Sequence, residues 1–281
     1  MPVIAMTQEM ATLGKDVALG LCEALGLAQV RHEVGDVVAG KMHVKKSLIR
    51  RIREGRASTI EKWSADDKTI SIFTAEEVLN LAVKGNVLIR GWGATLLLKP
   101  VSHIPCIRVC APLPVRVRRL MERLDTDDEQ LAKKEIENDD AARAAKMSSV
   151  FGVEWGDPAL YDITINTGRV PIPRAVDLVL SLLKDPAFAE TAQSRQRLLD
   201  LALEAKVRAA LRADEKTAEV DVSIEVDAGA VTLAGIVATP AERDRAAAVV
   251  AGVPGVLKVE NALNSMSGGL GWRLFPSGLT R

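Results

Sequence analysis

Gly14 and Lys15 are the first residues in the sequence whose types and spacing could do chemistry. They stand between a short apolar run at residues 3–6 and a segment at 17–25 whose apolar residues recur with helical spacing. This order predicts a strand, a turn and a helix. Backbone N–H groups at the start of a helix and a lysine side chain both attract anions, so a phosphate could bind there.

The spacing of a phosphate loop, G-x-x-x-x-G-K-[ST], is only partly present. Glu9 stands where the pattern has glycine, and Asp16 stands where it has a hydroxyl. On these residues alone, a strand–helix unit without a ligand is favoured over a phosphate site.

Arginine side chains form the second group with potential chemistry. Arg116, Arg119 and Arg123 are three and four positions apart, so they share one face of a helix that is expected to start after Pro114. Guanidinium groups aligned in this way repel one another unless an anion or carboxylates lie between them, yet exposed arginines on helices are common. An anion-binding row and an exposed helix face both remain open.

Two further basic segments have similar pairs of interpretations. Residues 41–56 hold the densest basic cluster, with Glu54 as the only acid. They form either a solvated helix face or a surface that holds a nucleotide or another polyanion. Residues 125–147, which include Arg143 and Lys146, form either a surface helix or a mobile lid that brings cations over a phosphate.

The elements that must position these groups alternate between strands and helices. Apolar runs at residues 86–93, 105–111 and 161–167 predict strands, and residues 172–183 predict a helix. Strands separated by helical segments indicate a largely parallel sheet of the α/β class, in which ligands bind beyond the carboxyl ends of the strands.

Residues from 195 onward predict a second, smaller unit. An apolar helical stripe is followed by strict alternation at residues 219–227, a turn at Ala228-Gly229 and a second strand. Thr239-Pro240-Ala241-Glu242 has the form of a capping box, and residues 256–263 close the unit as a strand. The predicted order is αββαβ, and its side chains suggest no active site.

Domain limits follow from these patterns. We predict domains at residues 1–185 and 195–264, a linker at 186–194 and a flexible tail at 265–281. Trp272 and Phe275 on the tail are costly to leave in water, so docking on the same domain or on another subunit is slightly favoured over disorder.

Composition excludes several classes of protein. The chain of 281 residues exceeds the usual size of one domain, and its 37 Lys and Arg balance 37 Asp and Glu, so no bulk positive field indicates nucleic-acid binding. No apolar run approaches the ~20 residues of a membrane span and the start lacks a leader pattern, so we expect a cytoplasmic protein. Three cysteines without Cys-x-x-Cys spacing and scattered histidines indicate no metal site.

Several motifs taken together resemble a known family. They are Thr7-Gln8-Glu9 with Gly14, the turn Arg90-Gly91-Trp92-Gly93-Ala94, Ala111-Pro112-Leu113 with Arg116 and Arg119, Asp140 with Arg143, and the long run at residues 151–162 that continues into Ile165-Asn166-Thr167. Through these motifs, residues 1–185 resemble the cytidylate kinase-like proteins, relatives of the nucleoside monophosphate kinases. The resemblance implies a P-loop kinase-like parallel sheet flanked by helices.

The second unit resembles a BON domain. The motifs are Val231-Thr232-Leu233-Ala234-Gly235, Glu242-Arg243, and Gly252-Val253-Pro254-Gly255-Val256 followed by Val259-Glu260-Asn261. This resemblance implies a small α+β module for regulation or interaction, of a kind linked with membranes, pores or regulatory binding. Because the sequence shows no export signal, we expect its partner to be a cytosolic protein or a small ligand.

The kinase resemblance also implies cofactors and site residues. ATP would be the donor, Mg²⁺ would bridge its phosphates, and a nucleoside monophosphate would be the acceptor. The residues implied to bind the donor nucleotide are Ala11, Thr12, Leu13, Gly14, Lys15 and Asp16. Lys15, Arg116, Arg119 and Arg143 are implied to be catalytic, and Arg50, Arg51, Gly91 and Gly93 to hold the acceptor. Positioning and charge neutralisation suffice for phosphoryl transfer.

Departures from the family pattern lead to an alternative function. Ala11 and Leu13 replace glycines of the loop, and their side chains are expected to restrict positive φ and the approach of backbone to phosphate. Asp16 brings negative charge toward the phosphates, and Trp92 replaces an arginine. The alternative is an inactive kinase-like sensor or assembly protein that acts through the BON domain and tail. Nucleic-acid binding through residues 41–56 is disfavoured because no aromatic residues are interleaved there.

Overall fold

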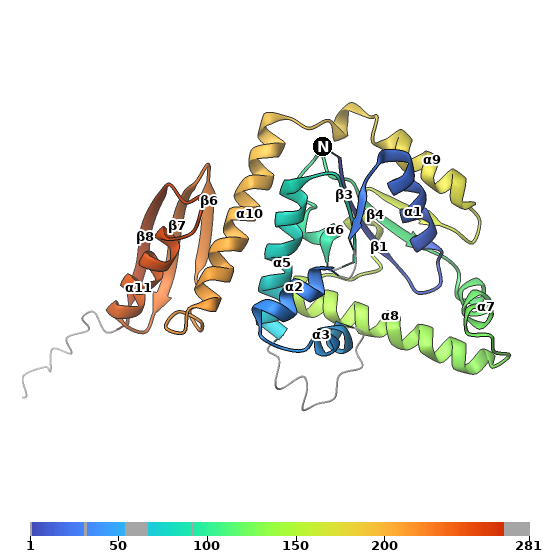
Figure 1. Cartoon of the computed structure of the whole chain (residues 1–281), viewed down its shortest axis with the longest axis horizontal. Coiled ribbons are helices and arrows are strands. Elements are labelled where there is room, and N and C mark those ends of the chain that lie inside the picture. The colour runs from blue at the N-terminus through green and yellow to red at the C-terminus, as the bar shows by residue number, and fades with distance from the viewer. Residues whose placement is uncertain (1, 31–32, 54–66, 92, 267–281) are drawn as a thin grey trace, which may run out of the picture. The chain divides into compact units, whose positions relative to one another are not determined.

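Two compact units make up the chain. Figure 1 shows a computed structural model, which describes residues 2–30, 33–53, 67–91 and 93–266. The first unit is Met1–Ala205 and the second is Lys206–Arg281. The boundary falls within helix α10 (Ala192–Ala213), and the predicted linker holds a short helix, η2 (Pro186–Phe188), and the start of α10. The predicted domain limits stay a prediction, and Trp272 and Phe275 lie outside the described residues.

A five-stranded parallel sheet forms the centre of the first unit. Its strand order is β2-β3-β1-β4-β5, and every neighbouring pair is parallel. The strands are β1 (Val3–Gln8), β2 (Ala28–Val30), β3 (Val87–Arg90), β4 (Cys106–Cys110) and β5 (Ile163–Asn166). The three inner strands are short apolar runs because both faces of the sheet are covered. The predicted α/β class and parallel sheet are confirmed.

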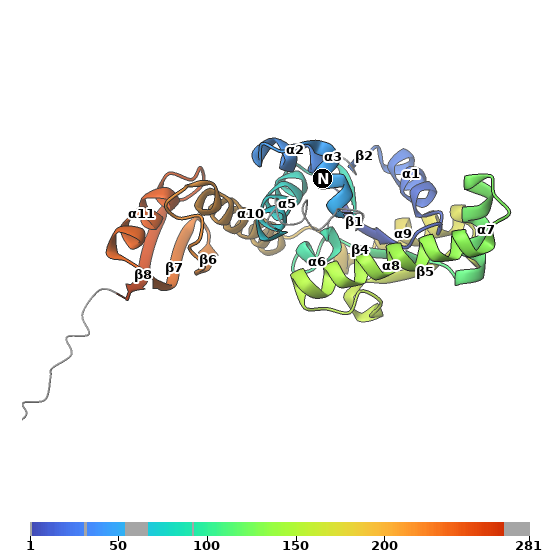
Figure 2. The same ribbon diagram turned by 90° about the horizontal axis from the view of Figure 1, so that it is seen from below.

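Helices pack against both faces of this sheet, and alternate side chains of each inner strand point to opposite faces. Ile4 and Met6 of β1 pack with α1 (Gly14–Leu25) and α9 (Ile172–Leu182), which lie side by side in Figures 1 and 2. The alternate residues Val3 and Ala5 are also buried, as expected for a strand covered on both faces. The other helices among the described residues of this unit are α2 (Glu33–Lys41), α3 (Lys46–Arg53), α5 (Asp67–Lys84), α6 (Ala94–Leu97), α7 (Leu113–Leu124) and α8 (Glu129–Phe151), with the short η1 (Pro158–Leu160).

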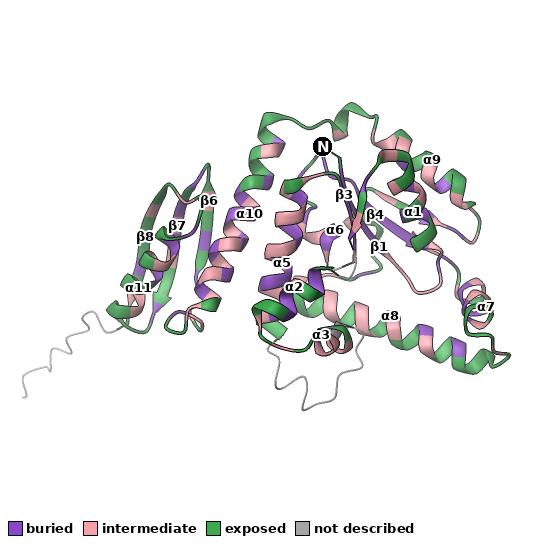
Figure 3. Ribbon diagram, viewed as in Figure 1, coloured by how far each residue is buried: buried purple, intermediate pink, exposed green. Residues whose placement is uncertain are grey.

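Long helix α8 contains most of the charged segment predicted at residues 125–147. Figure 3 shows that it is largely half-buried or exposed, in contrast to the purple inner strands. Its buried residues Ala132 and Ile136 pack with Val117 and Leu120 of α7. Helix α7 begins at Leu113, one residue before Pro114 and not after it as predicted, because the first turn of a helix tolerates a proline. The two helices therefore form a pair held by a small apolar cluster.

The second unit has the predicted order αββαβ. Its three strands, β6 (Ser223–Asp227), β7 (Ala230–Val237) and β8 (Lys258–Ser265), lie in the order β6-β7-β8 with helix α11 (Pro240–Ala251) before β8. Ala228 and Gly229 form the hairpin turn with positive φ. Thr239 accepts a hydrogen bond from the N–H of Glu242, whose carboxylate accepts one from the N–H of Ala238, so the capping box is confirmed.

Every helix in the described part of the chain is too short or too polar to cross a membrane.

Candidate functional site

The loop between β1 and α1 has the left-handed backbone conformation that we expected the side chains of Ala11 and Leu13 to restrict. Ala11 and Leu13 have φ values of 59° and 58°, in the left-handed region. A side chain in this region costs roughly 1–2 kcal/mol per residue. The expectation that these side chains restrict positive φ is therefore not met, and the cost must be offset by contacts around the loop.

Gly14 opens helix α1 against the end of β1. A Cβ atom at this position would lie 2.6 Å from Oε1 of Gln8 and 2.9 Å from its Cβ. That Gln8 oxygen accepts a hydrogen bond of 3.1 Å from Arg90, at the end of β3. Lys15 and Asp16 follow on the exposed side of the helix start. A glycine is required here because the strand and the helix approach so closely.

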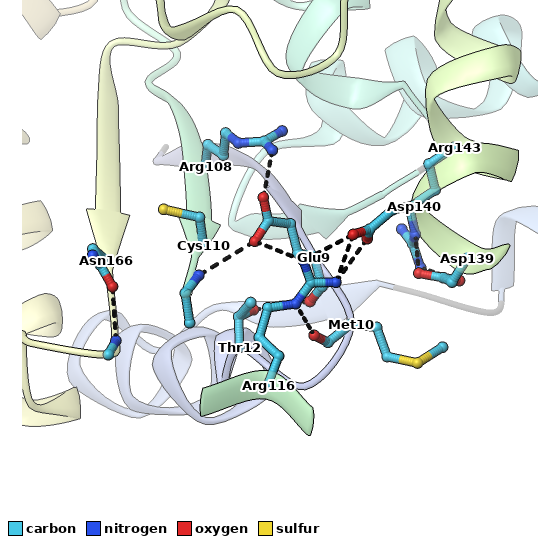
Figure 4. A network of polar contacts seen from close by, with 12 residues as sticks. Glu9, Met10, Thr12, Arg108, Cys110, Arg116, Asp139, Asp140, Arg143 and Asn166 are labelled. Carbon is cyan, nitrogen blue, oxygen red and sulfur yellow. Dashed lines mark hydrogen bonds and ion pairs between the residues drawn. The ribbon is translucent and has the colours of Figure 1, made fainter. Parts of the chain in front are cut away.

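Glu9 lies at the centre of a network of charged groups (Figure 4). Its Oε1 is 2.7 Å from a terminal nitrogen of Arg108, and its Oε2 is 3.3 Å from one of Arg116. The N–H of Ala111 also donates to Oε2. The position that a common phosphate loop gives to glycine is thus used here by a carboxylate that binds two nearly buried arginines.

Arg116 joins this loop to helix α8. Its Nε–H donates to the carbonyl oxygen of Met10 at 2.9 Å, and its terminal nitrogens lie 2.8 Å from both carboxylate oxygens of Asp140 (Figure 4). Only 4% of Arg116 is exposed. Burial raises the pKa of Asp140 above 3.8, and the hydrogen bond and charge of Arg116 oppose that shift.

A second carbonyl oxygen of the loop, that of Thr12, also accepts a hydrogen bond from a side chain outside the loop. Thr167 donates from Oγ1 to the carbonyl oxygen of Thr12 at 2.6 Å, and Thr12 donates from its own hydroxyl to the carbonyl oxygen of Glu9. Arg119 donates to the backbone carbonyl of Thr167 at 2.9 Å. The loop is therefore held through its carbonyl oxygens at both Met10 and Thr12.

Arg108 is held by aromatic residues of the run at 151–162. Its guanidinium lies 4.5 Å from the ring centre of Trp155 and 5.5 Å from that of Tyr161, and it donates to the carbonyl oxygen of Trp155. Burial raises the pKa of Tyr161. The indole N–H of Trp155 donates to Thr7, near the end of β1. The run at residues 151–162 therefore fixes Arg108, which in turn binds Glu9 of the loop.

A cavity of about 680 Å³ opens beside the loop. Gln8 and Met10 line it on the loop side, and Gly91 and Gly93 line it at the end of β3. Its cationic lining groups are Arg90, Arg123, Arg143 and Lys146, and its acidic ones are Glu135 and Asp139. Apolar side chains, among them Ile49, Ile70 and Phe151, complete the wall. A volume and a mixed lining of this kind suit a small organic anion.

Two of the cations that line the cavity, Arg143 and Lys146, already have carboxylate partners. Nε of Arg143 is 2.7 Å from Asp139, one turn earlier on α8, and the ammonium of Lys146 is 3.2 Å from Asp67. The side chain of Arg143 is 37% exposed. An anion that enters the cavity therefore competes with Asp139 for this guanidinium.

The predicted site residues fall into separate places. Gly91, Gly93 and Arg143 line the cavity, whereas Arg50 and Arg51 of α3 do not, and Ile49 and Ile52 take their place in the lining. The row of arginines divides in the same way, because Arg116 is buried in the Glu9 network, Arg119 holds Thr167 and exposed Arg123 lines the cavity.

Sequence reasoning missed the apolar wall and the role of Asp139. Helix α5, which contributes Ile70, carried no recognised signal. The (i, i+4) spacing of Asp139 and Arg143 could have indicated their pairing.

No group of three or more His, Cys, Asp or Glu residues that could hold a metal occurs in the parts of the chain that the structure describes. A magnesium ion carried by nucleotide phosphates needs only one or two protein oxygens, since water completes its shell. The exposed carboxylate of Asp16, in the first turn of α1, would supply one such oxygen. The residues present therefore fit a magnesium ion that arrives with its nucleotide.

Comparisons with known proteins agree with this architecture. Cytidylate kinase of Staphylothermus marinus is 25% identical over 140 residues, which are 49% of this chain and 78% of that protein. Cytidylate kinase of Methanococcus aeolicus is 24% identical over 158 residues, 56% of this chain and 86% of that protein. A crystal structure of an uncharacterized protein from Eubacterium ventriosum aligns with a TM-score of 0.51 and 21% identity, and covers 66% of this chain and 99% of that chain.

Family models match both parts of the sequence. The model of the BON domain matches residues 200–265, and the three-stranded sheet of the second unit fits it. The model of the cytidylate kinase-like family matches residues 3–169, more than half of the chain, and the loop and every residue named as lining the cavity lie within that range. The chain belongs to the cytidylate kinase-like family and carries a BON domain after its kinase-like unit.

Proposed function

We propose that the first unit binds ATP at the loop of residues 11–16 and transfers a phosphoryl group to a nucleoside monophosphate in the cavity. The single observation that carries the proposal is the adjacency of the two places: Gln8 and Met10 belong to the strand end and loop and also line the cavity. A donor phosphate at the loop would thus lie beside an acceptor in the cavity.

Donor binding follows from the loop and the helix start. The N–H groups at the start of α1 and the exposed ammonium of Lys15 together favour the negative charge of phosphates. Mg²⁺ bound to the nucleotide would neutralise part of this charge and orient the phosphates. Asp16 supplies a hard oxygen ligand for that ion.

Acceptor binding follows from the cavity. Arg90, Arg143 and Lys146 provide positive charge for a monophosphate, and the apolar wall with Phe151 suits a base. Arg143 would leave Asp139 for the phosphate and so approach the transferring group. Arg119, which holds Thr167 beneath the loop, would add positive potential from the other side.

The test is a coupled assay of ADP release with ATP, Mg²⁺ and each common nucleoside monophosphate. We expect the highest rate with cytidine monophosphate, since the similar curated proteins are named cytidylate kinases. Lys15→Ala is the control, because Lys15 is exposed and its truncation should leave the fold intact. Release of ADP no faster than in this control, with every acceptor, would contradict the proposal. A cytoplasmic location, where ATP and Mg²⁺ are abundant, goes with this function.

A second candidate is an assembly or sensor protein without turnover. It is favoured by the strained loop and by exposed apolar side chains of the BON unit, where Ile236 is 67% and Leu257 83% exposed. This candidate predicts thermal stabilisation by nucleotide without ADP release, or self-association that is lost when residues from 268 onward are deleted. A monomer that turns over ATP would exclude it.

A further inference from the structure

Two non-glycine residues of the loop are held in a conformation that costs free energy. Ala11 and Leu13 are both left-handed, with φ near 60°. Such residues persist only where the surrounding structure leaves the backbone no alternative. Hydrogen bonds to the carbonyl groups of Met10 and Thr12, the residues that precede Ala11 and Leu13, supply that constraint.

The carbonyl oxygens of Met10 and Thr12 each accept a hydrogen bond from a side chain outside the loop. Arg116 donates to the first at 2.9 Å and Thr167 to the second at 2.6 Å. In a trans peptide the N–H of the next residue points opposite to the carbonyl. The N–H groups of Ala11 and Leu13 therefore point away from these donors, and they donate to no other residue within the described ranges.

Alternate N–H groups that point outward from such a turn form a concave site for an anion. Arg116 can hold the carbonyl of Met10 only because other contacts fix the position of the Arg116 side chain. It contacts Glu9 at 3.3 Å and forms a fork with Asp140 of α8, with both terminal nitrogens 2.8 Å from the carboxylate. The anion-binding shape of the loop thus depends on a helix that follows it by more than a hundred residues.

We propose that Arg116, Asp140 and Thr167 are positioning residues, which hold the loop open toward phosphate and replace the conformational freedom that glycine would give at positions 11 and 13. Arg116 then acts through the backbone of the loop, since its donors are directed at Met10, Glu9 and Asp140. The inference rests on the proposed binding of phosphate at the loop.

The test measures the affinity for inorganic pyrophosphate by calorimetry in a cycle of variants. Asp140→Asn keeps the shape of the side chain and removes its charge from the fork. We expect it to weaken pyrophosphate binding by about fivefold or more, the factor that one strained residue is worth. The same change combined with Ala11→Gly and Leu13→Gly should weaken binding by about twofold or less, because glycine holds positive φ without help.

The matched control is Asp162→Asn. Asp162 is also a partly buried carboxylate, which accepts from the N–H of Cys106 at 2.7 Å and from Lys99 at 3.0 Å, and it lies outside the loop network. It should lower the melting temperature about as much as Asp140→Asn and leave the affinity for pyrophosphate unchanged. This comparison separates a loss of stability from a loss of positioning.

Each outcome has one consequence. An equal loss of affinity from Asp140→Asn in both backgrounds, or none in either, would overturn the proposal even if the protein transfers phosphoryl groups. If the variants change pyrophosphate affinity as expected but the wild-type protein releases no ADP, the positioning role is supported and only the proposed reaction is refuted. Wild-type protein that binds neither pyrophosphate nor ATP would overturn both.

Discussion

Replacement of Gly14 by alanine tests whether the close approach of β1 and α1 shapes the loop. The new Cβ would meet Oε1, Cβ and Cδ of Gln8 at 2.6–2.9 Å. Rotation of the side chain cannot relieve the contact with Cβ of Gln8, because that atom is fixed to a strand paired with β3 and β4. The backbone of the loop must therefore shift.

The expected magnitude follows from three contributions. Overpacking of this kind costs about 1–3 kcal/mol. Displacement of Gln8 also weakens its partly buried hydrogen bond with Arg90, worth about 1 kcal/mol. Alanine in a helix returns roughly 0.5–1 kcal/mol relative to glycine. The net loss is about 2 kcal/mol, which lowers the melting temperature by about 4–8 °C in a unit of this size.

Two other helical glycines serve as controls in thermal unfolding followed by fluorescence. A Cβ at Gly40 of α2 meets nothing within 4 Å, so Gly40→Ala should raise the melting temperature slightly. A Cβ at Gly20 of α1 would lie 2.8 Å from Cγ2 of Val176, so Gly20→Ala should lower the melting temperature without weakening pyrophosphate binding. Gly14→Ala alone should lower both. Melting of Gly14→Ala at or above the wild-type temperature would refute the reasoning.

Three further predictions concern groups away from the loop itself. Burial lowers the pKa of His103 below 6.5, so near pH 6 the unfolded chain binds more protons than the folded protein. The free energy of unfolding therefore falls as the pH drops from 7 through the folded pKa. Thermal melts should show that His103→Gln loses less stability than the wild type between pH 7.5 and pH 5.5. Burial raises the pKa of Cys106 to about 12, so iodoacetamide at pH 8 should leave this thiol unmodified in folded protein and label it after denaturation, as read by mass spectrometry of peptides. Trp155→Phe removes the indole hydrogen bond to Thr7 and weakens the stacking on Arg108, and should lower the free energy of unfolding by about 1–2 kcal/mol in urea titrations followed by circular dichroism.

Local patterns in the sequence were sufficient for most of the architecture. Apolar runs predicted β1, β3, β4 and β5, and the turn and capping signals predicted the order of the second unit, because each of these signals lies within a few residues of the element it shapes. Helix α5 and strand β2 were not predicted. Strand β2 has only three residues, too few to show a periodicity in the sequence.

The site was harder to predict because its contacts join distant segments. The spacing of Arg116 and Arg119 correctly indicated a common helix, yet their partners, Asp140 and Thr167, lie 24 and 48 residues further along the chain. Local sterics at Ala11 predicted the wrong φ for the same reason. The backbone of the loop is determined by side chains that no local window contains.

Helix α8 connects the two halves of the proposed site through adjacent residues. Asp140 binds Arg116, which holds the loop, and Asp139 binds Arg143, which lines the cavity. Neighbouring residues on a helix point about 100° apart, so one turn of α8 reaches both places at once. In the proposed reaction, an acceptor phosphate that takes Arg143 from Asp139 would act on the same turn that fixes Arg116 and, through it, the carbonyl of Met10. If the proposed acceptor binds in this way, we expect this turn to link occupancy of the cavity to the shape of the loop, and Asp140→Asn should then remove the effect of an acceptor on pyrophosphate affinity while Asp162→Asn retains it.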